Sequence, residues 1–156
     1  MNELQQDAID TTVKAALAED LGHVGDITCN ALIPEGMQST ASIVARADGI
    51  LCGMPCALTA LRFVDDTLNI TCHKKDGDIL KAGDVIATLQ GNTRSILTAE
   101  RTALNFLTHL SGIATLTAQF VKEVSGTNAK ILCTRKTHAG LRALEKYAVR
   151  MGGALN

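Results

Sequence analysis

The chain has 156 residues, enough for one ordinary domain with a substantial core, and 46% of them are hydrophobic. Only 3% are aromatic and Trp is absent, so the core must be built mainly from aliphatic side chains. The formal net charge is −1, and bulk charge therefore predicts neither a nucleic-acid nor a membrane partner. Any anion-binding site must arise from local clustering of cations.

The five cysteines are odd in number and scattered, and the first ten residues lack an apolar signal core. Apolar runs also stay well below the roughly 18 residues that a membrane span needs. We therefore expect a reduced, cytoplasmic protein. Cys52 and Cys56 have a spacing that could supply half of a metal site, but no second Cys or His pair follows at a suitable distance. Buried small hydrophobic residues are the preferred interpretation of both.

The first part of the chain is predicted to combine helices with short strands. Apolar residues on helical spacing predict two helices, and alternation of apolar with polar residues predicts strands joined by Gly-rich turns. The helices cover 4–19 and Pro55 to about 64, and the strands cover 39–47, the stretch between Gly49 and Gly53, 67–74 and short pieces within 76–97. A loop is expected from Asp26 onward.

A long helix is predicted from Thr98 to Val124 by apolar residues on helical spacing. Thr98 is expected to cap this helix, and Ser111-Gly112 is expected to bend or divide it. Arg101 then falls in the first turn, where the helix dipole disfavours a cation by about 0.3–1 kcal/mol. Arg101 is therefore a candidate anion-binding residue.

Two adjacent cations stand at the end of an apolar strand predicted over 130–137. A helix predicted over 139–151 follows, and in α/β sheets and barrels ligands bind at the carboxyl ends of the strands. Arg135 offers a planar fork suited to a carboxylate, and Lys136 a point charge suited to phosphate. Thr134 adds a hydroxyl donor. The alternative is a strand end that simply carries solvated cations.

Four sequence blocks together resemble one enzyme family. They are EDLG with GDIT within 19–28, ERTALNFLTHLSGIAT at 100–115, TRKTHAGLRALEKYAV at 134–149 and GGALN at 152–156. In content and order they are similar to quinolinate phosphoribosyltransferase, the carboxylating nicotinate-nucleotide pyrophosphorylase. The resemblance implies a pentosyltransferase of NAD biosynthesis. Such an enzyme converts quinolinate and phosphoribosyl pyrophosphate to nicotinate mononucleotide, pyrophosphate and CO2.

The resemblance also implies a fold and an assembly. The expected fold is an α+β N-terminal sandwich domain followed by the start of an α/β barrel, with the first βα unit only. Residues 1–115 would form the sandwich, which serves as substrate lid and dimerisation domain, and residues 116–156 the start of the barrel. The implied assembly is a homodimer, or a larger homo-oligomer of dimers, with shared active sites. Mg²⁺ is the implied cofactor, and its ligands are not expected in this chain.

Four residues match substrate-binding positions of the family. Arg101 corresponds to the arginine that reaches quinolinate from the neighbouring subunit, and Thr134, Arg135 and Lys136 match the substrate-binding Thr-Arg-Lys. The resemblance assigns no catalytic residue and no metal ligand here.

The sequence departs from the family pattern near this block. Cys133 stands where the family commonly has Asp, and His138-Ala139 replace a pair that usually ends in Pro. His138 is interpreted as a turn residue rather than a catalytic base. Asn156 stands where the family continues into His-Arg, then a further lysine and acidic residues. The 156-residue chain, as a fragment, is therefore expected to be inactive alone.

Other functions stay open at this point. DGDILKAGDVIATL (76–89) resembles the turns of biotinyl or lipoyl carrier domains, but Lys81 lacks the Met-Lys-Met or Asp-Lys-Ala context of the modified lysine. A non-catalytic binding or dimerisation module of this kind is one alternative. A related phosphoribosyltransferase with another substrate is the other.

Overall fold

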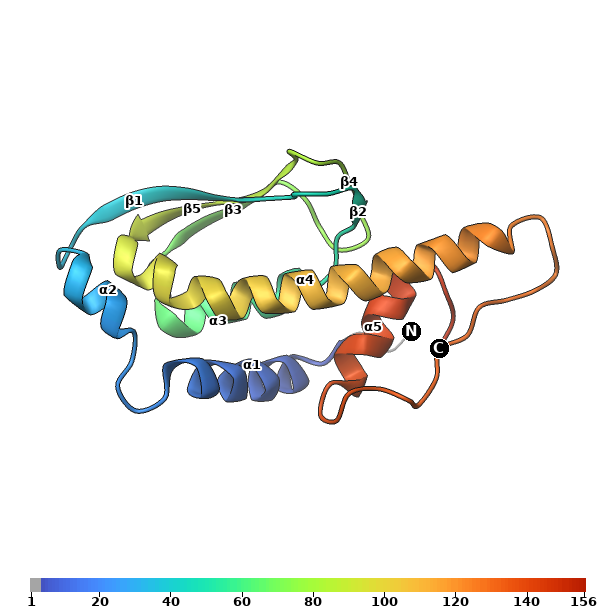
Figure 1. Ribbon diagram of the computed structural model, residues 1–156, viewed down its shortest axis with the longest axis horizontal. Helices are drawn as coiled ribbons and strands as arrows, with labels where there is room; N and C mark the ends of the chain where they lie inside the picture. The colour runs from blue at the N-terminus through green and yellow to red at the C-terminus, as the bar shows by residue number, and fades with distance from the viewer. Residues whose placement is uncertain (1–3) are drawn as a thin grey trace.

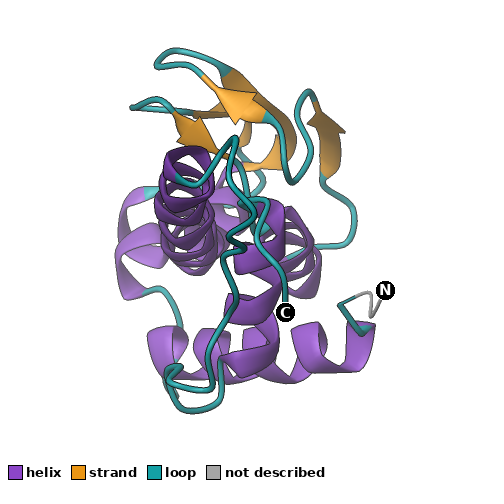
Figure 2. Ribbon diagram, turned by 90° about the vertical axis from the view of Figure 1, so that its right-hand side faces the viewer, coloured by secondary structure: helices purple, strands orange, loops and turns teal. Residues whose placement is uncertain are grey.

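The computed structural model describes residues 4–156 and shows a layer of strands over a layer of helices (Figures 1 and 2). The helices are α1 (Gln6–Leu21), α2 (Ile27–Leu32), α3 (Met54–Val64), α4 (Thr93–Glu123) and α5 (Arg142–Met151). The strands are β1 (Gln38–Val44), β2 (Gly49–Ile50), β3 (Asn69–Cys72), β4 (Ile79–Leu80) and β5 (Val85–Asn92). Among the described helices, none has the length and apolar character to cross a membrane. The expected division after residue 115 falls inside α4 and stays a prediction.

Antiparallel pairing joins three strands in the order β1-β5-β3, and β2 and β4 form a separate two-stranded sheet. β1 pairs with β5 from Gln38 opposite Asn92 to Val44 opposite Val85. Residues of β1 alternate between exposed and half-buried. This confirms the alternation predicted from the sequence, because one face of the strand covers the helices and the other meets solvent. A small antiparallel sheet backed by helices is an α+β arrangement.

Helix α4 runs beneath the strands along the length of the molecule (Figure 1). It is one uninterrupted helix of 31 residues, where the sequence predicted a bent or divided one. It begins at Thr93 and not at Thr98, because Asn92 is the N-cap and its side chain accepts a hydrogen bond from the Ser95 N–H at 3.2 Å. Gly112 therefore lies in a helix interior.

Two hydroxyl groups of α4 hold the segment around β2 against the helix. Ser111 Oγ accepts a hydrogen bond from the Cys52 N–H at 2.9 Å and donates to the Cys52 carbonyl at 3.0 Å. Thr115 Oγ1 accepts from the Ile50 N–H at 2.9 Å. Because another segment satisfies these hydroxyls, they do not compete for the backbone of α4, and Ser111 does not interrupt the helix.

Asp76 ties the start of α3 to α5. Its carboxylate accepts hydrogen bonds from the backbone N–H groups of Gly53 at 3.0 Å and Met54 at 2.9 Å. The same carboxylate accepts the Tyr147 hydroxyl at 2.9 Å. An anion at a helix N-terminus satisfies free N–H groups and complements the helix dipole. Gly53, the residue at the N-cap position of α3, has no side chain that could do this, and Asp76 caps the helix in its place.

The core lies among α1, α3, α4, α5 and the sheet, and it is aliphatic, as the composition predicts. Its fully buried side chains include Val13, Leu51, Leu61, Leu110 and Leu144. Cys52 and Cys56 are also fully buried, and burial raises the pKa of the Cys56 thiol to about 12. Both thiols therefore pack as small apolar groups. All five cysteines are free.

Besides α4, two segments differ from the prediction. The loop expected from Asp26 is the short helix α2, because Asp26 Oδ1 caps it by accepting the Cys29 N–H at 2.9 Å. Residues 130–137 were predicted to form a strand, but within residues 4–156 they do not pair with another strand in a sheet. A single parallel bridge joins Leu132 to Leu155, and Leu132 is 66% exposed. The expectation of a strand covered on both faces is wrong for the described chain, since a parallel strand needs neighbours on its edges.

Candidate functional site

The segment that carries the paired cations lies beside the C-terminal half of α4 and leads into α5 (Figure 1). Together these three parts line a hollow of about 330 Å³, here called the C-terminal hollow. It is lined by His109, Ile113, Thr117 and Phe120 of α4, by residues 131–134 and 136–138, and by Glu145, Lys146 and Val149 of α5.

Short hydrogen bonds curl the segment at its cations. Thr134 Oγ1 accepts the Lys136 N–H at 3.1 Å, and the Thr137 N–H donates to the Arg135 carbonyl at 3.0 Å. Thr134 and Lys136 line the hollow, whereas Arg135 is not among its lining residues. All three residues are exposed. An anion can therefore meet Lys136 and Thr134 from inside the hollow, with the guanidinium of Arg135 outside it.

Arg101 lies elsewhere on α4. A helix rises about 1.5 Å per residue, which puts Arg101 about 12 Å along the axis from His109, toward the N-terminal end of α4, whereas the hollow is lined by His109 and later residues of α4. Because α4 begins at Thr93, Arg101 is about two turns inside the helix. The dipole argument for an anion partner, which needed a first-turn position, is therefore wrong. Thr134 and Lys136 share a hollow, and Arg101, which is exposed, does not join them within one chain.

Three side chains meet at the C-terminal hollow in an arrangement that the sequence did not reveal. Glu145 Oε1 accepts hydrogen bonds from His109 Nε2 at 3.0 Å and from His138 Nδ1 at 2.6 Å, and Glu145 Oε2 accepts the His138 backbone N–H at 3.2 Å. Glu145 is only 7% exposed. Burial acts to raise the pKa of its carboxyl, but the hydrogen bonds from the two histidines outweigh burial and hold that pKa below its usual value.

One sequence signal for this cluster existed. Glu145 lies on the face of α5 that also buries Leu144 and Ala148. A carboxylate on a buried helix face needs a partner, because an unpaired buried charge is very costly. The partner from α4, His109, is 36 residues away in sequence, so its identity could not be read from local spacing.

The cluster does not suit Mg²⁺. The cluster brings together three side chains of the kinds that bind metals, and their ligand atoms all lie within 4.8 Å of one another. Two of its three ligand atoms are imidazole nitrogens, whereas Mg²⁺ takes oxygen ligands in octahedral geometry. No reaction step is therefore assigned to Mg²⁺ on these residues.

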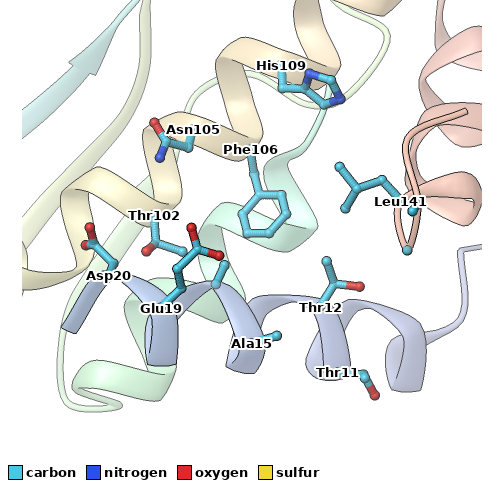
Figure 3. A pocket seen from close by; sticks show the side chains of 13 residues that line it. Thr11, Thr12, Ala15, Glu19, Asp20, Thr102, Asn105, Phe106, His109 and Leu141 are labelled. Carbon is cyan, nitrogen blue, oxygen red and sulfur yellow. The ribbon is translucent and has the colours of Figure 1, made fainter. Parts of the chain in front are cut away.

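A larger groove of about 790 Å³ lies between α1, α4 and the turn before α5 (Figure 3). Three of the family-like blocks meet there, with Glu19 and Asp20 from the first, Asn105 and His109 from the second and Gly140 from the third. Its described lining residues include two carboxylates and neither Lys nor Arg. Negative charge repels anions, so this groove is a poor site for an anionic substrate. The C-terminal hollow is the better candidate.

Two family models match the chain. The model for the N-terminal domain of quinolinate phosphoribosyl transferase matches residues 26–111, and the model for its C-terminal domain matches residues 113–156. The carboxylating nicotinate-nucleotide pyrophosphorylase of Mycobacterium leprae is 45% identical over 158 residues, which cover 100% of this chain and 56% of that protein. The chloroplastic protein of the same name from Arabidopsis thaliana is 44% identical over 144 residues, which cover 92% of this chain and 41% of that protein.

Solved structures agree with the sequence matches. The nicotinate-nucleotide pyrophosphorylase of Francisella tularensis superposes with a TM-score of 0.94 at 42% identity, over 99% of this chain and 55% of that one. Human nicotinic acid phosphoribosyltransferase, at 13% identity and a TM-score of 0.60 over 99% of this chain and 35% of that one, shares the fold alone. The chain spans about half the length of the curated relatives that it matches. With both of its regions matched in this way, the chain belongs to the quinolinate phosphoribosyl transferase family.

Proposed function

We propose that the protein is a decarboxylating quinolinate phosphoribosyltransferase, which forms nicotinate mononucleotide, pyrophosphate and CO2 from quinolinate and phosphoribosyl pyrophosphate. The observation that supports this most is that Thr134, Lys136 and Lys146 line one hollow. Quinolinate is a dicarboxylate and phosphoribosyl pyrophosphate is strongly anionic. Bringing them together requires a cationic site that offsets their repulsion and orients both reactants.

In this proposal the three residues of the Thr-Arg-Lys block bind substrate. The planar guanidinium of Arg135 pairs with a carboxylate through two parallel hydrogen bonds, and the ammonium of Lys136 binds a phosphate as a point charge. Thr134 adds its hydroxyl. Departure of pyrophosphate leaves positive charge on the ribose carbon, and loss of CO2 leaves negative charge on the pyridine ring. A cation held near that ring stabilises the second charge as it develops.

Arg101 is proposed to act at the site of a neighbouring subunit. Its exposure and its position about 12 Å along α4 from His109, away from the C-terminal hollow, support this arrangement. The proposal includes a homodimer, or a larger assembly of dimers, with shared active sites. Residues 1–115 would provide the lid and the dimer contact, and residues 116–156 the first part of an α/β barrel.

Cofactor and location complete the proposal. Mg²⁺ is the metal that the family resemblance implies, and in this proposal its ligands lie outside the residues described here. The free state of all five cysteines agrees with a reducing compartment, and we place the protein in the cytoplasm.

The direct test is release of CO2 from carboxyl-labelled quinolinate by the protein, expressed at the length that its gene encodes. Release should depend on phosphoribosyl pyrophosphate. Arg135→Ala should lower kcat/KM by a factor on the order of 10–100, because hydrogen bonds to charged groups contribute about 1.5–3 kcal/mol. Arg62→Ala, which changes an exposed arginine of α3, should leave kcat/KM unchanged. An Arg135→Ala protein with unchanged kcat/KM, or a natural protein that releases no CO2, would contradict the proposal.

A mixing experiment tests the shared site. Arg101→Ala and Arg135→Ala proteins should each keep at most about a tenth of the natural kcat/KM. If each site combines Arg135 of one subunit with Arg101 of the other, a mixed dimer contains one intact site. Random reassociation of equal amounts should then restore about one quarter of the natural activity. No recovery on mixing would mean that Arg101 acts within its own subunit, and natural activity of the Arg101→Ala protein alone would place Arg101 away from the site.

A further inference from the structure

The cluster of His109, His138 and Glu145 offers two imidazole nitrogens and one carboxylate oxygen within 4.8 Å of one another. We propose that this cluster binds one divalent transition-metal ion of the Zn²⁺, Co²⁺ or Ni²⁺ class. The three side chains would be its protein ligands, and a fourth position would stay open toward the C-terminal hollow. Two histidines and one glutamate form a ligand set that such ions accept, with an open position for water or another ligand.

Two of the three distances in the cluster are close to those that coordination needs, and the third, between the two imidazole nitrogens, is within 4.8 Å. Metal–ligand bonds of about 2.0–2.2 Å put two tetrahedral ligand atoms roughly 3.3–3.6 Å apart. Glu145 Oε1 lies 2.6 Å from His138 Nδ1 and 3.0 Å from His109 Nε2. An ion that replaces the two hydrogen-bonded protons therefore has to separate these atoms by at most about 1 Å. The His138 side chain is 74% exposed, so it can rotate by this amount without disturbing the core.

The burial of the cluster also favours a cation. Glu145 carries a carboxylate that is almost fully buried, and its side-chain partners are two imidazole rings rather than a Lys or Arg side chain. A dication bound to Glu145 would neutralise this charge. Lys136 and Lys146, which line the same hollow, oppose a cation there, and they make an anion the suitable fourth ligand.

The proposed ion is separate from the substrate-binding set. None of Arg101, Thr134, Arg135 and Lys136 is one of its ligands, and its donor atoms do not suit Mg²⁺. Binding of the ion can therefore be measured without turnover, and its outcome is independent of the test of the proposed enzyme activity.

The experiment is calorimetric titration of the untagged chain with Zn²⁺, together with visible absorption spectra of the chain with Co²⁺. Cys72→Ser and Cys133→Ser are introduced first, because Cys72 is exposed and Cys133 partly so, and their thiols would otherwise bind the ion. One ion should bind per chain, with the Co²⁺ spectrum of a tetrahedral nitrogen and oxygen site. His138→Asn should weaken binding by a factor of about 10–100 or more. Loss of a residue that only hydrogen-bonds to a metal ligand already weakens metal binding by about 10–100-fold, and loss of a direct ligand should weaken it further.

Controls separate this site from other histidines and from misfolding. His23→Asn removes an exposed histidine outside the cluster and should leave binding unchanged. His109→Asn, made in parallel, should weaken binding as His138→Asn does, and far-UV circular dichroism should show that both variants keep their helices. A folded chain that takes up no Zn²⁺ with one-to-one stoichiometry overturns the proposal. Binding that survives both histidine substitutions overturns it as well.

Discussion

Replacing Gly112 by alanine should make the chain more stable. Gly112 lies in the interior of the continuous helix α4, and a Cβ built there meets no heavy atom within 4 Å. Alanine in a helix interior is about 0.8–1 kcal/mol more favourable than glycine, because glycine loses more conformational freedom on folding. Open space around the new methyl group means that no steric cost offsets this gain.

Gly152→Ala is the matched substitution with the opposite sign. Gly152 ends α5 where that helix packs on α4. A Cβ built on Gly152 overlaps the Ala114 carbonyl oxygen and lies 2.6 Å from Thr117 Cβ. The overlapped carbonyl belongs to the backbone and cannot rotate away, so the helices must move apart. Overpacking of this kind costs about 1–3 kcal/mol.

Urea unfolding followed by far-UV circular dichroism measures both effects. With an m-value of about 2 kcal/mol per molar urea, a gain of about 1 kcal/mol raises the midpoint by roughly 0.5 M. The melting temperature should rise by about 2–4 °C. An unchanged or lowered midpoint for Gly112→Ala would refute the reasoning, because it would mean that α4 is interrupted there or that another surface packs on Gly112. An unchanged midpoint for Gly152→Ala would refute the close approach of α5 to α4.

Acidity and thiol chemistry provide two further tests. Hydrogen bonds from the side chain and backbone of Cys29 lower the pKa of Asp26 in the folded chain. The stability that ionised Asp26 contributes is therefore present above its unfolded-state pKa, and it is lost as the pH falls through its folded-state pKa. Asp26→Ala should therefore cost about 1 kcal/mol at neutral pH and less in acid, measured as a midpoint difference that shrinks with pH; a constant difference would contradict this. Iodoacetamide at about pH 8 should label exposed Cys72 and spare Cys56, which is 0% exposed and has a raised pKa. Peptide mass spectrometry of the native chain checks this, and rapid labelling of Cys56 would show that the core opens.

The parts of the fold that could be predicted are those set by local periodicity. Apolar spacing located α1, α3 and α5 to within a few residues, because each helix buries one stripe of side chains such as Ile9, Val13 and Leu17. The start of α4 was missed because Asn92 and Thr98 are both good caps. The helix begins after Asn92 because β5 ends there, and the end of β5 could not be located from local sequence. Local sequence also could not show that, within residues 4–156, the segment 130–137 makes only the bridge between Leu132 and Leu155.

Some residues of the candidate site could likewise be predicted from local sequence, and others could not. Arg135 and Lys136 stood out because adjacent cations follow an apolar run, and that signal is local. His109 and Glu145 did not, because they meet only when α4 packs against α5. The carrier-like turn between β4 and β5, in which Lys81 pairs with Asp48 at 2.7 Å, lies within the residues that the N-terminal family model matches. Interpretation as a carrier domain is replaced by the family assignment.

The continuity of α4 limits how the molecule can move. The two regions matched by family models meet at residue 112, yet α4 passes through that point as one helix from Thr93 to Glu123. Asp76 adds a second connection by joining the start of α3 to Tyr147 of α5. The regions therefore cannot swing apart about a hinge at residue 112 without breaking a helix in mid-length. Opening of the C-terminal hollow must therefore come from movement of residues 130–141, which lie between α4 and α5.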